Sequence, residues 1–163
     1  MNRLTVIDKK NGNQPKYSYD KKIIGFFNGC IFNFKEIRKY LISKNINFNS
    51  NSDTEVLINS YSFWGDKCFN YFDGMWGVSL YNFEEKRLIL SRDYLGQKPL
   101  FYSKINSKKL IYSSQINGIT DYLNYLNLSK ENIKLFYQLS HLPAPYTIYK
   151  NINQVEPGEI IKI

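Results

Sequence analysis

The sequence of 163 residues contains few of the residues on which cross-linked or metal-dependent proteins are built. It has two cysteines, Cys30 and Cys68, which cannot form a disulfide framework and do not have the spacing of a zinc site. No apolar run approaches the roughly 18 residues of a membrane span, and the first residues show no secretory apolar region. We therefore expect a soluble protein of a reducing, cytoplasmic compartment, with no metal site.

The common catalytic signatures are also absent. The sequence has no P-loop, no GxGxxG, no GxSxG and no HExxH pattern. Its one histidine, His141, stands beside Leu142 and Pro143, which is more typical of a loop residue than of a general base. Serine-hydrolase and metalloprotease chemistry are thus poorly supported.

Acidic residues are in the minority, but the basic excess does not define a nucleic-acid surface. The formal net charge is +8, and the sequence is also rich in isoleucine, asparagine and tyrosine while containing a single alanine, Ala144. Codon bias towards A and T explains much of this composition. The lysines are dispersed, whereas a phosphate-binding face is usually clustered. A nucleic-acid binder is therefore a minor alternative.

The chain reads as one domain, residues 1–163, of the α+β class. Its length is close to the usual prior of about 150 residues per domain, and no repeat or linker divides it. Short runs that are apolar, or that alternate between apolar and polar residues, predict strands. Apolar residues that recur three and four positions apart predict helices. The expected strands are 4–8, 22–27, 75–81, 87–91, 100–103, 110–113 and 159–163, and the expected helices are 33–45, 52–65 and 130–139, with a short helical turn at 68–72.

Capping patterns mark the beginnings of the helices. Asn33 with Glu36, and Ser52 with Glu55, have the spacing of a capping box. Ser129 is the expected cap of the third helix.

Two polar segments could carry chemistry. Asn28 and Gly29 follow an apolar strand, and a side-chain amide beside a glycine N–H can offer two donors to a developing oxyanion. An ordinary strand-to-helix turn is the alternative. The segment 91–100 is densely polar, and taken alone it could be a charged turn in which Arg92 pairs with Asp93.

Six segments, in order and with matching spacing, resemble one known family. The run FNGCIFN at 27–33 resembles the family's FNGEIYN, and SRDYLGQKPL at 91–100 resembles SRDRLGIKPL. The others are NSDTE at 51–55, FDGMW at 72–76, SSQ at 113–115 and the segment 147–158. Together they resemble the type-2 glutamine amidotransferase domain of asparagine synthetase, and the resemblance covers essentially the whole sequence.

The resemblance implies a fold and a reaction. The fold is a four-layer sandwich of the N-terminal-nucleophile hydrolases, with two antiparallel sheets between helical layers. The reaction is hydrolysis of glutamine to glutamate and ammonia. The thiol of an N-terminal cysteine attacks the side-chain amide, its own α-amine acts as the base, and a thioester forms.

The resemblance also assigns residues. Asn28 and Gly29 would form the oxyanion hole, Arg3 would bind the α-carboxylate of glutamine, and Asp53 would pair with its α-ammonium. Cys30 stands where the family has a glutamate that helps to hold this ammonium. No cofactor is expected in this chain, because ATP and magnesium would belong to the synthetase domain.

The sequence departs from the family at its beginning. Family members start with Met-Cys-Gly, a strand and an RGPD segment, whereas this sequence starts with Met1-Asn2-Arg3. We therefore expect a fragment without its first strand and its nucleophile, inactive alone, whose partners are a separately encoded N-terminal segment or a synthetase domain. Replacement of the nucleophile by Cys30 is disfavoured, since Cys30 has no free α-amine. A non-catalytic interaction module is the main alternative.

Overall fold

The computed structural model describes residues 13–106, 109–123 and 125–163. The helices are α1 (Phe34–Ser43), α2 (Asp53–Trp64), the 3-10 helix η1 (Gly65–Tyr71), α3 (Asn117–Thr120) and α4 (Lys130–Leu139). The strands are β1 (Lys16–Tyr17), β2 (Ile23–Ile31), β3 (Gly74–Asn82), β4 (Arg87–Arg92), β5 (Phe101–Asn106), β6 (Lys109–Ser113), β7 (Asn153–Gln154) and β8 (Ile160–Lys162).

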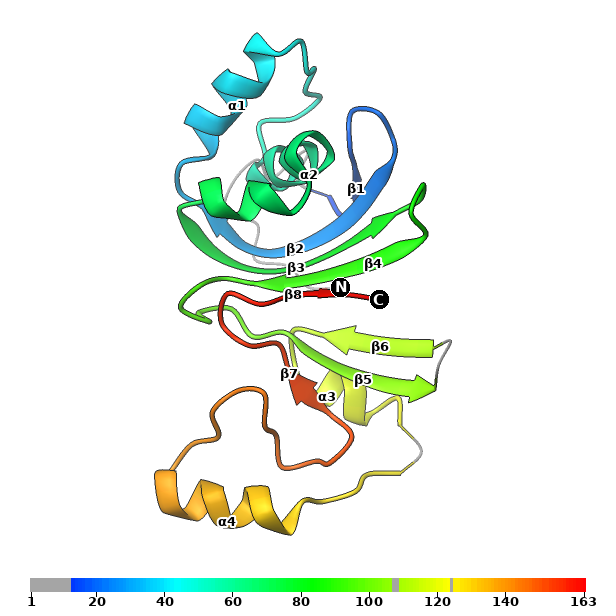
Figure 1. Cartoon of the computed structure of the whole chain (residues 1–163), viewed down its shortest axis with the longest axis vertical. Helices are drawn as coiled ribbons and strands as arrows, with labels where there is room; N and C mark the ends of the chain where they lie inside the picture. The colour runs from blue at the N-terminus through cyan, green and yellow to red at the C-terminus, as the bar shows by residue number, and fades with distance from the viewer. Residues whose placement is uncertain (1–12, 107–108, 124) are drawn as a thin grey trace.

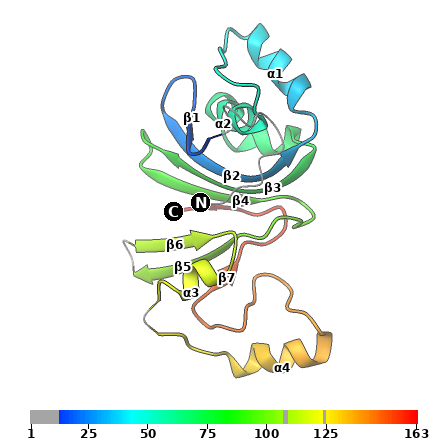
Figure 2. The same cartoon turned by 180° about the vertical axis from the view of Figure 1, so that it is seen from behind.

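Two antiparallel sheets lie face to face between helices. The larger sheet has the order β1-β2-β3-β4-β8 and the smaller the order β6-β5-β7. Figure 1 shows α1 and α2 over the outer face of the larger sheet, and α3 and α4 beyond the smaller one; Figure 2 shows the same layers from behind. The four-layer sandwich expected from the resemblance is thus confirmed. The strand expected at 4–8 lies outside the described residues.

The helix caps agree with the predictions at two of three sites. The hydroxyl of Ser52 accepts from the N–H of Glu55 at 3.3 Å, and that of Ser129 accepts from Asn132 at 3.2 Å. Asn33 directly precedes α1, but its side chain makes no cap bond. It instead donates to the carbonyl of Tyr71 and accepts from the N–H of Asp73. The start of α1 was therefore predicted correctly, but the prediction that the Asn33 side chain caps this helix was wrong.

Most of the apolar core lies between the larger sheet and α1 and α2, where residues such as Leu57, Val78 and Trp76 are fully buried. A smaller core of Leu90, Leu100 and Val155 lies between the two sheets. Because this second core is small, the interface between the sheets has room for a cavity.

The two predicted hairpins, β3-β4 and β5-β6, are present, as is β8 near the C-terminus. The short strands β1 and β7 and the helix α3 were not predicted. His141 is exposed in the loop that follows α4, as expected. Within the described ranges, no helix has both the length and the apolar character needed to cross a bilayer.

Candidate functional site

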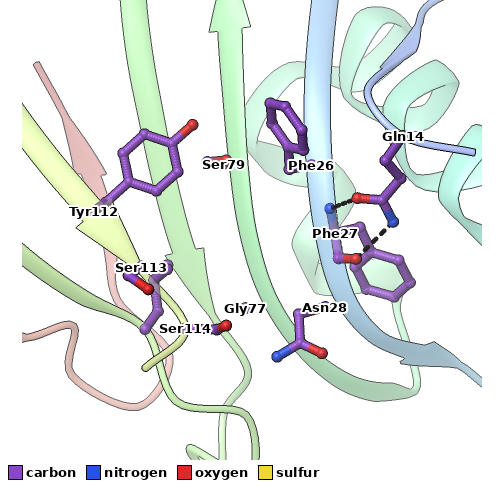
Figure 3. Close-up of a pocket in the computed structure, with 10 residues that line it drawn as sticks. Gln14, Phe26, Phe27, Asn28, Gly77, Ser79, Tyr112, Ser113 and Ser114 are labelled. Atoms are coloured by element: carbon purple, nitrogen blue, oxygen red, sulfur yellow. Dashed lines mark hydrogen bonds between the residues drawn. The ribbon is translucent and has the colours of Figure 1, made fainter. Parts of the chain in front are cut away.

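A cavity of about 290 Å³ opens between the two sheets. Figure 3 shows that the larger sheet contributes one wall and the smaller sheet the other. The lining residues are Gln14, Phe26, Phe27, Asn28, Gly77, Ser79, Leu100, Tyr112, Ser113 and Ser114. Of the residues predicted for a site, Asn28 is in this wall.

Asn28 reaches the cavity because of the alternation of side chains along β2. Residues Phe27 and Ile31 point to the α2 side and are buried, whereas Phe26 and Asn28 point to the opposite face. Asn28 pairs with Gly77 of β3, which carries no side chain to cover it. The Asn28 carboxamide therefore stays exposed and points into the cavity (Figure 3).

Gly29 has a packing reason to be glycine. A β-carbon at this position would lie 2.0 Å from the carbonyl oxygen of Met75 and 2.9 Å from the Cα of Trp76. Both atoms belong to the backbone of β3 and cannot rotate away. The close approach of β2 and β3 thus requires a glycine here, whether or not its N–H has a chemical role.

The edge of β2 that faces away from β3 is held by side chains. Phe27 donates its N–H to Oε1 of Gln14 at 2.8 Å, and its carbonyl accepts from Nε2 of Gln14 at 2.7 Å. Ile31 donates to Oδ2 of Asp53 at 3.3 Å. Since backbone groups alternate along an antiparallel strand, the Gly29 N–H points to this same edge, between the two bonded positions.

Asp53 is the first residue of α2 and is 2% exposed. Besides Ile31, its carboxylate accepts from the N–H of Thr54 at 2.9 Å. Asp53 therefore joins the beginning of α2 to Ile31, the last residue of β2, which directly follows Cys30. Asp53 is thus near the predicted oxyanion donors. Arg3, the other predicted substrate ligand, lies outside the described residues.

Cys30 is half-buried next to Gly29 and pairs with Met75 across the sheet. Burial raises the pKa of its thiol, the negative charge of Asp53 raises this pKa further, and Lys98 lowers it. A raised pKa keeps the thiol protonated at neutral pH, and the protonated form is a poor nucleophile. The environment of Cys30 thus gives no support to its use as a replacement nucleophile.

The loop after β4 is organised around Asp93, which is fully buried. One carboxylate oxygen accepts from the N–H groups of Leu95 and Gln97, and the other from those of Trp76 and Lys98. These bonds connect the loop to β3 beside the cavity.

Arg92 does not pair with Asp93 as the charged-turn interpretation proposed. It donates instead to the carbonyls of Lys98, Val155 and Gly96. The segment 91–100 is thus a rigid frame that places Pro99 and Leu100 over Gly77.

The main residue of this site that sequence reasoning missed is Gln14. Local sequence patterns do not reveal its role, because glutamine is common on surfaces and the partner of Gln14 is 13 residues away. Pro15 beside it signals only that a regular strand is interrupted at this point.

A solved structure has a similar fold. Glutamine phosphoribosylpyrophosphate amidotransferase from B. subtilis superposes with a TM-score of 0.61 at 20% identity, covering 92% of this chain and 29% of that one. At this identity the likeness establishes the fold alone, which is the four-layer sandwich described above.

Sequence comparison then gives the family. Residues 1–163 match the family described as the glutamine amidotransferase domain, and the chain belongs to that family. Asparagine synthetase (glutamine-hydrolyzing) 1 of Bacillus subtilis (strain 168) is 33% identical over 156 residues, which are 96% of this chain and 24% of that protein. Asparagine synthetase 3 of the same organism is 30% identical, over 98% of this chain and 26% of that protein. The chain thus spans about a quarter of the length of these relatives.

Proposed function

We propose that this chain is the glutamine-binding amidotransferase domain of an asparagine synthetase-like system, and that glutamine places its side-chain amide in the cavity between the sheets. The observation that carries the proposal is the arrangement of Asn28 and Gly29. An exposed carboxamide points into the cavity, and the adjacent N–H points to an edge where both neighbouring positions are already bonded. A side-chain amide and a backbone N–H that are adjacent in this way can stabilise the oxyanion of acyl transfer.

The amino-acid end of glutamine would be held by charged groups. Asp53 would pair with the α-ammonium and Arg3 with the α-carboxylate. With Cys30 in place of a glutamate, one charge-assisted contact is lost, which costs about 1.5 to 3 kcal/mol, or roughly 10- to 150-fold in affinity. We therefore propose weak glutamine binding.

The reaction needs a thiolate that attacks the amide carbon, releases ammonia and leaves a thioester for water to hydrolyse to glutamate. Neither cysteine of the printed sequence fits this task. Cys30 has a raised pKa, and Cys68 is fully buried with its pKa raised well above the usual value by burial. We propose that a polypeptide of these 163 residues binds glutamine without hydrolysing it, and that another segment supplies the thiol and its α-amine.

The relatives suggest which kind of domain would use the released ammonia. They are named asparagine synthetases and are about four times as long as the matched region. We propose that a synthetase domain, in the same or in a separate chain, uses the ammonia, and that ATP and magnesium would be bound there. The cytoplasm is the proposed compartment, in keeping with two free cysteines.

The proposal is tested by calorimetric titration of the chain with L-glutamine, beside an assay for released glutamate. Binding in the millimolar range, without turnover, is expected. Turnover that disappears in Cys30→Ala would make Cys30 the nucleophile after all. No binding would leave the non-catalytic interaction module as the better description, and salt-sensitive binding to random DNA would favour the nucleic-acid alternative.

A further inference from the structure

Among the described residues, the bond pair between Gln14 and Phe27 continues the edge contact of β2 beyond the end of β1. Lys16 pairs with Gly25 in β1, so the next positions along this edge of β2 would face Pro15 and then Gln14. The β2 residues that offer their backbone groups to this edge are the odd-numbered ones, so the next such position after Gly25 is Phe27, which would face Gln14. The backbone pairing of β1 ends at Lys16, before it reaches this position. At Phe27, the partner of the β2 backbone within the described ranges is the side chain of Gln14.

The carboxamide of Gln14 can take this place because it is chemically a peptide group. It accepts from the Phe27 N–H at 2.8 Å and donates to the Phe27 carbonyl at 2.7 Å, as a neighbouring strand would. Figure 3 shows both bonds at the wall of the cavity. The paired contact fixes the orientation of the peptide that leads from Phe27 into Asn28.

The position of these bonds matters for the oxyanion donors. Asn28 and Gly29 lie between two anchored residues, Phe27 on Gln14 and Ile31 on Asp53. On their other side they are held by pairing with β3. With one anchor removed, the backbone that sets the direction of the Asn28 side chain, towards the cavity, and of the Gly29 N–H, at the edge of β2, would be less firmly held. Fixed alignment is the property that makes such donors effective.

We propose that Gln14 is a positioning residue of the glutamine site: its carboxamide acts as a surrogate strand that aligns the donors of Asn28 and Gly29. This inference rests on the proposed glutamine binding. Gln14 acts through the backbone of Phe27 and is not a catalytic residue.

The test compares Gln14→Ala and Gln14→Met with Gln97→Ala as the control. Methionine keeps the length of the side chain and removes both bonds, which separates hydrogen bonding from packing. Gln97 is exposed on the loop after β4. Three quantities are measured: the Kd for L-glutamine, the melting temperature, and the hydrogen-exchange rate of the Phe27 amide by NMR.

We expect both Gln14 variants to raise the Kd for glutamine about tenfold and to raise the exchange rate of the Phe27 amide at least tenfold. In the Gln97→Ala control, the Kd and the exchange rate should stay as in the original chain. A Gln14→Met variant that binds glutamine like the original chain would overturn the inference. A lower melting temperature with unchanged affinity would also overturn it, because it indicates a purely structural role. If the original chain does not bind glutamine, the proposed function fails, and unchanged exchange at Phe27 would refute the anchor separately.

Discussion

Replacement of Asp93 by asparagine is expected to destabilise the domain strongly, although the two side chains have almost the same size. Asp93 is fully buried and accepts four backbone N–H groups, two on each oxygen. Asparagine has one oxygen and one NH2 group in the same positions. Two of the four N–H groups would then face another donor instead of an acceptor.

The magnitude follows from counting the lost bonds. A hydrogen bond to a charged group contributes about 1.5 to 3 kcal/mol, and the lower figure suits a loop that is partly exposed. Two lost bonds give about 3 kcal/mol, a large fraction of the 5 to 15 kcal/mol that typically stabilises a domain. With a urea m-value of about 2 kcal/mol per molar, the midpoint of unfolding should fall by about 1.5 M.

The assay is urea unfolding followed by tryptophan fluorescence, with Asp121→Asn as the control. Asp121 is exposed beside α3, and its replacement should change the free energy of unfolding by no more than about 0.5 kcal/mol. If Asp93→Asn unfolds within that same margin of the original chain, the four bonds do not organise the loop as described.

Three further predictions concern the site and the helix that supports it. Cys30→Glu should tighten glutamine binding by roughly 10- to 150-fold in calorimetry, and an unchanged Kd would show that the lost carboxylate does not matter. Alkylation of Cys30 by iodoacetamide should be slower at pH 7 than that of a free cysteine and should rise at a higher pH, because burial and Asp53 raise the pKa of the thiol; a reaction at pH 7 as fast as that of free cysteine would contradict this. Ser52→Ala should cost about 1 kcal/mol in urea unfolding, since its hydroxyl accepts the Glu55 N–H at the start of α2, and full stability would refute the cap.

The parts of the fold that the sequence predicted are those defined by neighbouring residues. Ser52 and Ser129 cap helices through bonds that span three residues, and such bonds depend on local spacing alone. The hairpins have polar turns of a few residues between apolar runs, so they too could be found locally.

The features that were missed depend on residues far apart in the sequence. Asn33 has the spacing of a cap, but its side chain bonds to Tyr71 and Asp73, about 40 residues away. Gln14 acts through Phe27, and β1 is too short to produce an alternating pattern. Pairing of this kind is decided by the assembled sheet.

In the candidate site, too, local features were predicted and contacts between distant residues were missed. Asn28 and Gly29 were predicted as site residues from their place after a strand expected at 22–27 and from the resemblance. The structure places both within β2, which extends to Ile31, and puts Asn28 at the cavity wall. The interpretation of Arg92 and Asp93 as an ion pair was wrong, because both are buried and each is bonded to backbone groups of the folded loop. Opposite charges next to each other in a sequence do not reveal which backbone groups surround them.

The most direct test of the central claim is an NMR titration of the 15N-labelled chain with L-glutamine, with L-norvaline, which lacks the side-chain amide, as the control. The account predicts saturable shifts of the Asn28 side-chain NH2 and of the Gly29 N–H with glutamine, and much smaller shifts of these two signals with norvaline. Unmoved signals of Asn28 and Gly29 at saturating glutamine, or equal shifts with both compounds, would contradict it.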